Sequence, residues 1–210
     1  REAGSNTFLL PNREVFLDML TDSGVNAMSE AQYAAMMMAD DSYAGSETYY
    51  RLAATLSDIF GTRYFLPAHQ GRACENILAN AFVTEGSYSV MNYHFTTTKA
   101  HITRMGGTVV EVMDDAALNP DSDDPFKGNF NLDKLRQTVD KVGADKISFV
   151  RIEAGTNLIG GQPVSLQNMR DVSAFCRERK IMLVFDARLL ADNPYFIKTR
   201  EEECRDRAPP

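Results

Sequence analysis

Two patterns of apolar residues alternate along the chain. Apolar residues at helical spacing predict amphipathic helices, which cover residues 29–41, 46–61, 71–84, 96–107, 131–143 and 165–180. Short, nearly continuous apolar runs predict buried strands, which cover residues 62–67, 88–93, 108–113, 146–154 and 181–186. Strands of this kind that alternate with amphipathic helices indicate an α/β fold, in which a mostly parallel sheet is covered on both faces.

Composition and charge narrow the class of protein. The 210 residues are 44% apolar and 24% charged, which is typical of a soluble globular protein. The net charge of −7, without a long basic run, argues against nucleic acid or an anionic membrane as a partner. We find no signal peptide and no apolar run near the ~20 residues of a membrane span. Three cysteines without metal-ligand spacing favour a reducing compartment, so we expect a cytoplasmic protein.

Polar and aromatic side chains follow four of the predicted strands, at the edge of a parallel sheet where ligands bind. Residues 70–72 open a helix, whose unpaired amides attract an anion such as phosphate. Phe95 and Asn157 follow two other strands, and Asp186 ends a fourth, where its partly desolvated carboxylate needs a cationic partner. Each alone can be read as a helix cap, a turn or a core residue. Together they are the parts needed to hold a flat, phosphorylated, nitrogen-containing ring.

Longer motifs carry a resemblance to a known family. The motifs are NTFLL (6–10), LTDSGVNAMS (20–29), YAGSETYY (43–50), HQGRACEN (69–76), FTTT (95–98), PFKGNFNLDKL (125–135), NLIGGQPVSLQNMR (157–170) and FDARLLADNPYFIKTRE (185–201). The chain resembles the β-eliminating lyases, the tyrosine phenol-lyase and tryptophanase family of pyridoxal-phosphate enzymes. Thr96, VGADKI (142–147) and TNLIGGQPVS (156–165) are more similar to the tyrosine phenol-lyase branch.

The resemblance runs nearly end to end and implies a fold and a cofactor. The expected fold is an α/β, fold-type-I, aminotransferase-like large domain with a mostly parallel sheet, and the expected cofactor is pyridoxal 5′-phosphate. The matching cofactor residues are Gln70, Gly71 and Arg72 at the phosphate, Phe95 against the pyridine ring, Asn157 at the 3′-oxygen and Asp186 at the ring nitrogen.

The resemblance also implies substrate and cation sites. The matching residues are Phe8 against the substrate ring, Thr21 and Ser23 near the substrate carboxylate, Tyr43 as general acid on the leaving group, Thr96 at the phenolic hydroxyl, and Gly24 with Asp41 at a monovalent cation, K⁺ or NH₄⁺. Asp41 stands where the family has a glutamate, so its reach is one methylene shorter. Because the family's cation lies across a subunit interface, the resemblance implies a homo-oligomer, either a dimer or a tetramer.

Two departures from the family pattern concern the cofactor. The family's arginine at the 3′-oxygen matches position 189, where this chain has Leu189. Arg188 is one position early, and we count it with the expected cofactor-binding residues. On a strand that shift would turn the side chain to the opposite face. The lysine that forms the Schiff base lies beyond the aspartate in the family, and the only lysine after Asp186 here is Lys198, at an expected exposed helix position. We therefore expect a truncated chain of low or no activity alone.

The resemblance divides the chain and assigns a reaction. Residues 1–45 are expected to form an N-terminal arm with the dimer contact, and residues 46–210 to form the pyridoxal-phosphate-binding large domain. The implied reaction is β-elimination of an aromatic amino acid, with tyrosine giving phenol, pyruvate and ammonia. Two alternatives stay open, namely a tryptophanase that gives indole, pyruvate and ammonia, and a non-catalytic interaction module derived from the lyase fold.

Overall fold

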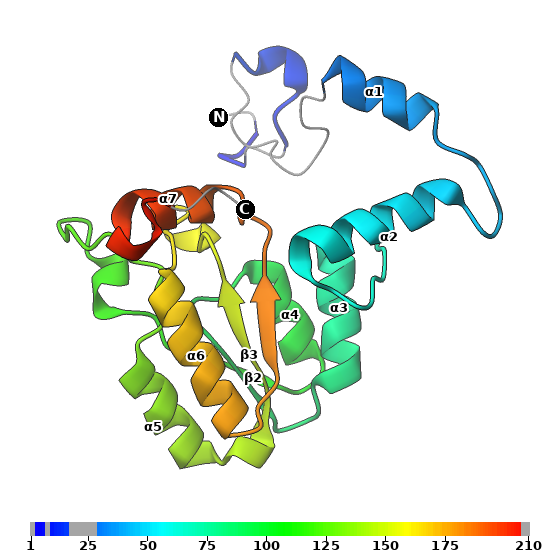
Figure 1. The fold of residues 1–210 in the computed structure, drawn as a ribbon. Helices are drawn as coiled ribbons and strands as arrows, with labels where there is room; N and C mark the ends of the chain where they lie inside the picture. Colours follow the sequence, from blue (N-terminus) through cyan, green and yellow to red (C-terminus); the bar gives the residue numbers. More distant parts are fainter. Residues whose placement is uncertain (1–2, 7–8, 17–28, 207–210) are drawn as a thin grey trace. The chain divides into compact units, whose positions relative to one another are not determined.

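A computed structural model describes residues 3–6, 9–16 and 29–206 of the chain (Figure 1). The chain forms two compact units, Arg1–Phe65 and Leu66–Pro210. We call them the N-terminal unit and the sheet unit, and we describe each by itself. In the part of the chain that the structure describes, no helix is both long enough and apolar enough to cross a membrane.

The N-terminal unit contains two helices, each of which begins at a serine. The hydroxyl of Ser29 and the third residue of α1 (Glu30–Met37) cap each other reciprocally, which satisfies two backbone amides. Ser46 caps α2 (Glu47–Phe60), and this helix ends at Gly61, whose φ of 65° is left-handed. Both helices were predicted from the spacing of apolar residues, and both predictions are confirmed.

The strand predicted over residues 62–67 is wrong. These residues have no regular secondary structure, and Tyr64 and Leu66 are exposed. A strand is stable only when a neighbouring strand accepts and donates its backbone hydrogen bonds. None of the described strands pairs with this segment, and Pro67 has no amide to offer.

The sheet unit is built on four parallel strands. They are β1 (Tyr88–Met91), β2 (Thr108–Glu111), β3 (Ile147–Glu153) and β4 (Leu183–Asp186), arranged in the order β2-β1-β3-β4. All four lie within predicted strands. The predicted α/β fold with a parallel sheet is therefore confirmed.

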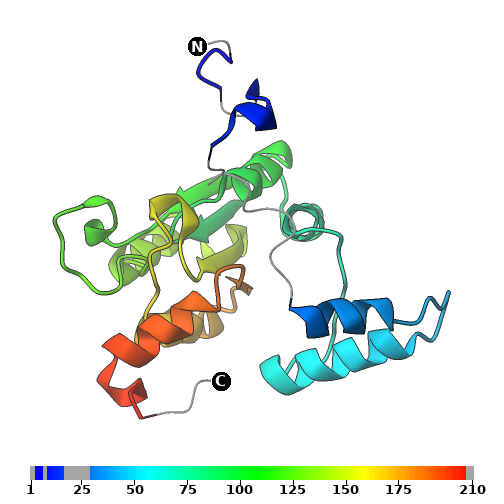
Figure 2. The same cartoon turned by 90° about the horizontal axis from the view of Figure 1, so that it is seen from above.

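The strands finish at one edge of the sheet, which Figure 2 views from above. Met91 at the end of β1 lies opposite Glu111 of β2 and opposite Arg151 of β3. Glu153, the last residue of β3, lies opposite Asp186, the last residue of β4. Groups that follow these strands therefore start from the same edge.

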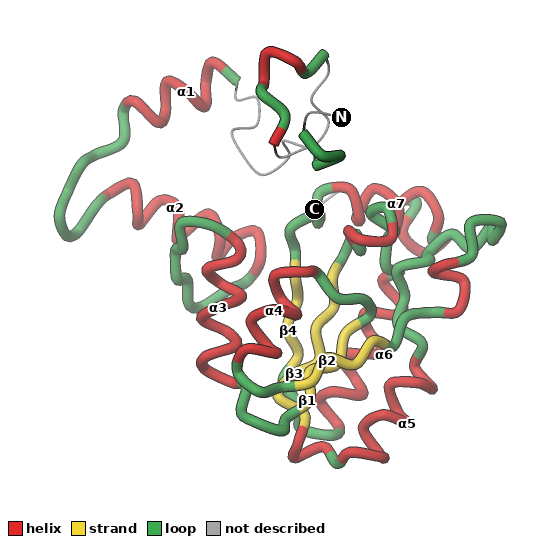
Figure 3. The backbone as a smooth tube through the Cα atoms, turned by 180° about the vertical axis from the view of Figure 1, so that it is seen from behind, coloured by secondary structure: helices red, strands yellow, loops and turns green. Residues whose placement is uncertain are grey.

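Helices connect the strands and cover both faces of the sheet (Figures 1 and 3). The α-helices are α3 (Gly71–Phe82), α4 (Thr96–Arg104), α5 (Leu132–Val142), α6 (Leu166–Glu178) and α7 (Asp192–Arg200). Short 3₁₀ helices are η2 (Asn12–Glu14), η3 (Asp115–Leu118), η4 (Ala144–Lys146), η5 (Asn157–Ile159) and η6 (Glu202–Cys204).

Two apolar cores form because successive strand residues point to opposite faces. On one face, Val90 and Val150 pack with buried residues of α5 and α6, among them Leu135 and Val172. On the other face, Phe149 and its neighbours pack against α3 and α4. The apolar stripes that predicted these helices are the faces that cover the sheet.

Candidate functional site

The first turn of α3 is open to a ligand. Gln70 precedes the helix in an extended conformation, and its side chain makes no capping hydrogen bond but contacts His69 Nε2 at 2.9 Å. A Cβ atom added to Gly71 would meet nothing within 4 Å, and Arg72 is exposed beside it. The amides of a helix start that lacks a side-chain cap can bind an anion.

Glu75 joins the start of α3 to the start of α4. Its two carboxylate oxygens accept hydrogen bonds from the hydroxyls of Thr97 and Thr98, both at 2.5 Å. The threonines lie in the first turn of α4, directly after Phe95 and Thr96. This clamp holds the residues before α4 close to the first turns of α3.

Asp186 at the end of β4 has the cationic partner that its position requires, and this partner is Arg151 of the neighbouring strand. The Arg151 guanidinium donates to Asp186 Oδ2 at 2.5 Å. The backbone amide of Arg188 donates to the other oxygen, Oδ1, at 3.1 Å. The carboxylate is 25% exposed, so one side of it still faces out of the sheet.

Glu153 links the same arginine to Asn157. Arg151 lies 3.5 Å from Glu153 Oε2, and the Asn157 amide donates to Oε1 at 3.5 Å. Burial raises the pKa of the Glu153 carboxyl, and the charge of Arg151 opposes this shift. Asn157 is half-buried at the start of η5, so its turn is attached to the charged group at the strand ends.

Arg188 lies over Phe95. Its Cζ atom is 5.3 Å from the centroid of the Phe95 ring, a distance at which a cation is attracted to an aromatic face. The strand geometry that would turn Arg188 away does not apply here, and its role at the cofactor stays a prediction. Strand β4 ends at Asp186 and residues 188–191 form a turn, so the two-residue alternation of a strand does not apply.

Two further residues hold the turns at this edge in place. The Asn92 amide group is buried and donates to the Gly128 and Glu153 carbonyls at 2.9 and 3.1 Å, while its oxygen accepts from the Glu153 amide. Gly155 has a φ of +75°, and a Cβ there would lie 2.6 Å from Leu189 Cβ. The turn after β3 and the turn after β4 are therefore in close contact.

The sheet unit thus connects Phe95, Asp186 and Asn157, whereas no described contact joins residues 70–72 to them. Contacts run from Phe95 through Arg188 to Asp186, and from there through Arg151 and Glu153 to Asn157. The sequence reasoning missed Glu75, Asn92, Arg151 and Glu153. The sequence gives a signal for Asn92, Arg151 and Glu153, which are polar or charged residues inside apolar predicted strands. Such a residue needs a buried partner.

Of the predicted substrate and cation residues that the structure describes, Thr96 belongs to the sheet unit and two others to the N-terminal unit. Tyr43 and Asp41 are exposed residues of the N-terminal unit. Thr96 is exposed at the start of α4. The remaining predicted residues lie outside the described part of the chain, and they are Phe8, Thr21, Ser23 and Gly24.

Asp40 organises the loop that carries Tyr43 and Asp41. Its carboxylate accepts hydrogen bonds from the hydroxyls of Ser42 and Ser46 at 2.8 and 3.0 Å. It also accepts from the amides of Glu47 and Thr48 at 3.1 and 2.9 Å, at the start of α2. These hydrogen bonds, led by those from Thr48, hold the pKa of Asp40 well below its usual range.

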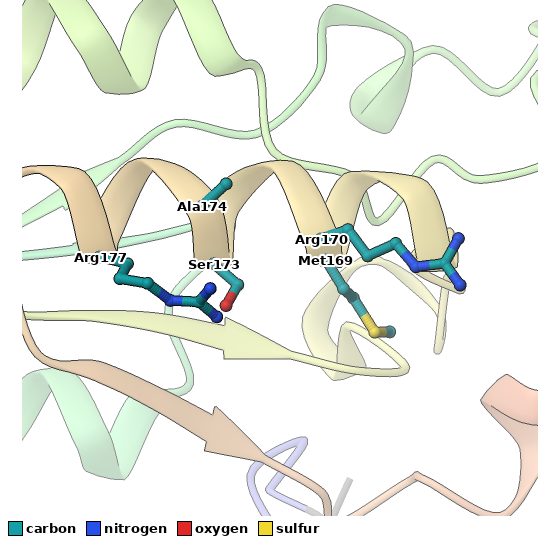
Figure 4. A pocket seen from close by; sticks show the side chains of 5 residues that line it. All are labelled: Met169, Arg170, Ser173, Ala174 and Arg177. Carbon is teal, nitrogen blue, oxygen red and sulfur yellow. The ribbon is translucent and has the colours of Figure 1, made fainter.

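Two hollows lie on the surface of the sheet unit. The first, of about 370 Å³, follows α6, where Met169, Ser173 and Arg177 project from the same side of the helix (Figure 4). The second, of about 220 Å³, lies between the turn after β3 and the start of α7 and is lined by Gly160 and Asn193, among others. Neither is lined by a predicted cofactor or substrate residue.

Comparison with known proteins finds relatives that match nearly the whole of this chain. It is 46% identical over 206 residues to the tyrosine phenol-lyase of Pasteurella multocida, covering 98% of this chain and 45% of that protein. It is 44% identical over 207 residues to the tyrosine phenol-lyase of a Symbiobacterium species, covering 99% of this chain and 45% of that protein. The chain therefore spans a little under half the length of these curated relatives.

Solved structures share the fold. The α-aminoadipate aminotransferase of Thermus thermophilus has a TM-score of 0.56 at 17% identity, over 74% of this chain and 38% of that chain. A putative aromatic amino acid β-eliminating lyase/threonine aldolase from an Exiguobacterium species has a TM-score of 0.55 at 18% identity, over 87% and 51%. The expected aminotransferase-like fold is confirmed.

The family assignment rests on a match over most of the chain. The model of the family named Beta-eliminating lyase matches residues 18–206, a range that includes all four strands and every predicted cofactor residue. The chain belongs to the β-eliminating lyase family.

Proposed function

We propose that this chain is the cofactor-binding part of a pyridoxal-phosphate-dependent lyase that cleaves L-tyrosine to phenol, pyruvate and ammonia. The observation that carries the proposal is the continuous set of contacts from Phe95 through Asp186 to Asn157 at the edge where the parallel strands end. The identity of 42–46% to several tyrosine phenol-lyases supports tyrosine as the substrate.

The groups at this edge fit pyridoxal 5′-phosphate. The uncapped start of α3 suits a phosphate, and the guanidinium of Arg72 adds a positive charge there. Phe95 offers a flat ring for stacking, and Asn157 an amide for the 3′-oxygen. Asp186 has one oxygen bonded by Arg151 and one by the Arg188 amide. Because each carboxylate oxygen has about two acceptor positions, Asp186 can accept one more hydrogen bond from a ring nitrogen.

Bound pyridoxal phosphate would supply an electron sink that stabilises negative charge at the substrate Cα. The residues of this chain bind and orient around it. Gln70 and the Gly71 amide would hold the phosphate together with Arg72, and Asp186 would hold the proton at the ring nitrogen. Tyr43 donates a proton to the leaving phenol ring, whose hydroxyl Thr96 binds.

The remaining predicted roles belong to the same proposal. Phe8, Thr21 and Ser23 contact the substrate, and Gly24 with Asp41 contributes to a K⁺ or NH₄⁺ site. The working form is a cytoplasmic homo-oligomer, a dimer or a tetramer. We propose low or no turnover for the 210-residue chain alone, since the Schiff-base lysine of the family has no counterpart in it.

Cofactor binding tests the proposal at the level of this chain. We expect pyridoxal phosphate to bind the purified chain without a covalent bond, with a change in its absorbance and in tyrosine fluorescence. Asp186→Asn should weaken binding about tenfold or more, because a hydrogen bond to a charged group contributes roughly 1.5–3 kcal/mol. The matched control is Asp123→Asn, at an exposed loop position. The proposal is wrong if pyridoxal phosphate binds no better than inorganic phosphate.

Product analysis separates the alternatives. Pyruvate and phenol from L-tyrosine support the proposed reaction, whereas indole from L-tryptophan indicates a tryptophanase. An interaction module is favoured by one observation, namely that Met37 and Met38 near the end of α1 and Ile59 and Phe60 of α2 are exposed apolar side chains. Formation of oligomers by a chain that fails to bind pyridoxal phosphate indicates that module.

A further inference from the structure

A buried arginine stands behind the carboxylate at the end of β4. Arg151 is 2% exposed and lies in β3 between Met91 of β1 and Val184 of β4. Burying a guanidinium costs several kcal/mol of desolvation, and apolar residues of similar volume often stabilise a protein as well or better. Packing alone therefore does not explain a positive charge at this position.

The Arg151 guanidinium lies closer to one neighbouring carboxylate than to the other. It is 2.5 Å from Asp186 Oδ2 but 3.5 Å from Glu153 Oε2. Glu153 is 4% exposed, and its burial favours the neutral acid. Arg188, which follows β4, is a further positive charge that acts on Glu153. Of the two carboxylates that Arg151 contacts, Asp186 is therefore the closer one.

We propose that Arg151 is a positioning residue that acts through Asp186 and limits how strongly this carboxylate holds a proton on the ring nitrogen of pyridoxal phosphate. The inference rests on the proposed function, in which Asp186 faces that nitrogen. The guanidinium fixes one carboxylate oxygen and withdraws negative charge from it. It also places a positive charge close to a ring that would itself become positive on protonation.

The consequence is a ring nitrogen that is less strongly protonated than one beside a lone aspartate. A less protonated ring withdraws fewer electrons from the substrate. Arg151 would therefore set the strength of the electron sink while the residues that touch the cofactor stay unchanged.

The test compares two probes that differ only at the ring nitrogen. They are pyridoxal 5′-phosphate and its 1-deaza analogue, in which a C–H group replaces the nitrogen. Their dissociation constants with the 210-residue chain are measured at pH 7, and the selectivity is the ratio of the constant for the analogue to that for pyridoxal phosphate. Loss of packing alone would weaken both probes equally and leave this ratio unchanged.

Arg151→Met removes the charge and keeps an unbranched side chain, and we expect it to raise the selectivity about fivefold or more because the Coulomb repulsion of the protonated ring is gone. Arg151→Lys retains the charge and should stay within about twofold of the unchanged chain. Arg104→Met removes an exposed guanidinium at the end of α4 and serves as the charge control. If Arg151→Met does not fold, Arg151→Gln gives the same comparison with a polar side chain.

The role of Arg151 and the proposed contact of Asp186 with the ring nitrogen are overturned by different results. An unchanged or lower selectivity in both Arg151→Met and Arg151→Gln overturns the role of Arg151. A failure of the unchanged chain to bind pyridoxal phosphate, or equal affinity for both probes in the unchanged chain and in Asp186→Asn, overturns the proposed contact of Asp186 with the ring nitrogen instead.

Discussion

The two units of the chain are stabilised in different ways. In the sheet unit, strands and helices bury two apolar cores, and the groups at the sheet edge are attached to buried residues such as Asn92 and Arg151. In the N-terminal unit, α1 and α2 bury none of their residues. Near the helix starts, the side-chain oxygens of Ser29, Asp40 and Ser46 accept hydrogen bonds from backbone amides.

This difference bears on the proposed site. The proposed cofactor residues Asp186 and Asn157 are bonded to the buried side chains of Arg151 and Glu153, so the packing of the sheet positions them before any ligand binds. The loop with Tyr43 is held by the single carboxylate of Asp40 and is exposed. We therefore expect substitutions in the sheet unit to affect global stability, and substitutions in the N-terminal unit to affect local order.

The largest expected effect comes from the core. Phe149→Ala removes a fully buried ring that packs against α3 and α4 and should cost about 3–5 kcal/mol of unfolding free energy, through lost burial and a cavity. Urea unfolding followed by circular dichroism measures it. Met37→Ala, at an exposed position of α1, should change the same quantity by less than about 0.5 kcal/mol. Equal effects of the two substitutions would contradict the comparison.

Most of the fold could be predicted from the sequence, because apolar periodicity reports directly which residues face the core. The strand 88–93 and the helix 131–143 were found this way, and both lie in the sheet unit. The segment 62–67 has a strand-like composition but no strand beside it. Pairing depends on distant residues, so a local pattern could not exclude a strand there.

The candidate site was only partly predictable. Phe95, Asn157 and Asp186 could be found because they follow strands, where ligand groups gather. Asn92 and Arg151 hold these residues in place, but they lie beside or inside apolar runs, and their roles depend on partners 35 or more positions away. The sequence shows that Arg151 is a charged residue in an apolar strand, but it does not show that Asp186 is its partner.

An effect of intermediate size is expected in the pH dependence of the unfolding free energy of the sheet unit. Burial raises the pKa of Glu153 in the folded sheet unit, so the stabilisation from its protonated form is complete below the unfolded pKa of ~4.3 and is lost as the pH rises through the folded value. Glu153→Gln should remove this loss and flatten the rise of stability toward acid in that range. Urea midpoints at several pH values measure the change. Glu178→Gln, at the exposed end of α6, is the matched control, and a similar flattening in both variants would contradict the role of burial.

The smallest expected effect is local to Asp40, and its contribution to stability changes with pH in the opposite direction to that of Glu153. Hydrogen bonds lower the pKa of Asp40 in the folded N-terminal unit, so its contribution is complete above the unfolded pKa of ~3.9 and is lost as the pH falls through the lowered folded value. At pH 7, Asp40→Ala should therefore speed hydrogen exchange at the Glu47 and Thr48 amides, which it caps. Asp58→Ala, near the end of α2, should leave both amides protected. Because the cap touches no buried core, the urea midpoint of the sheet unit should not move with Asp40→Ala, and a matching shift there would show that the two units are stabilised together.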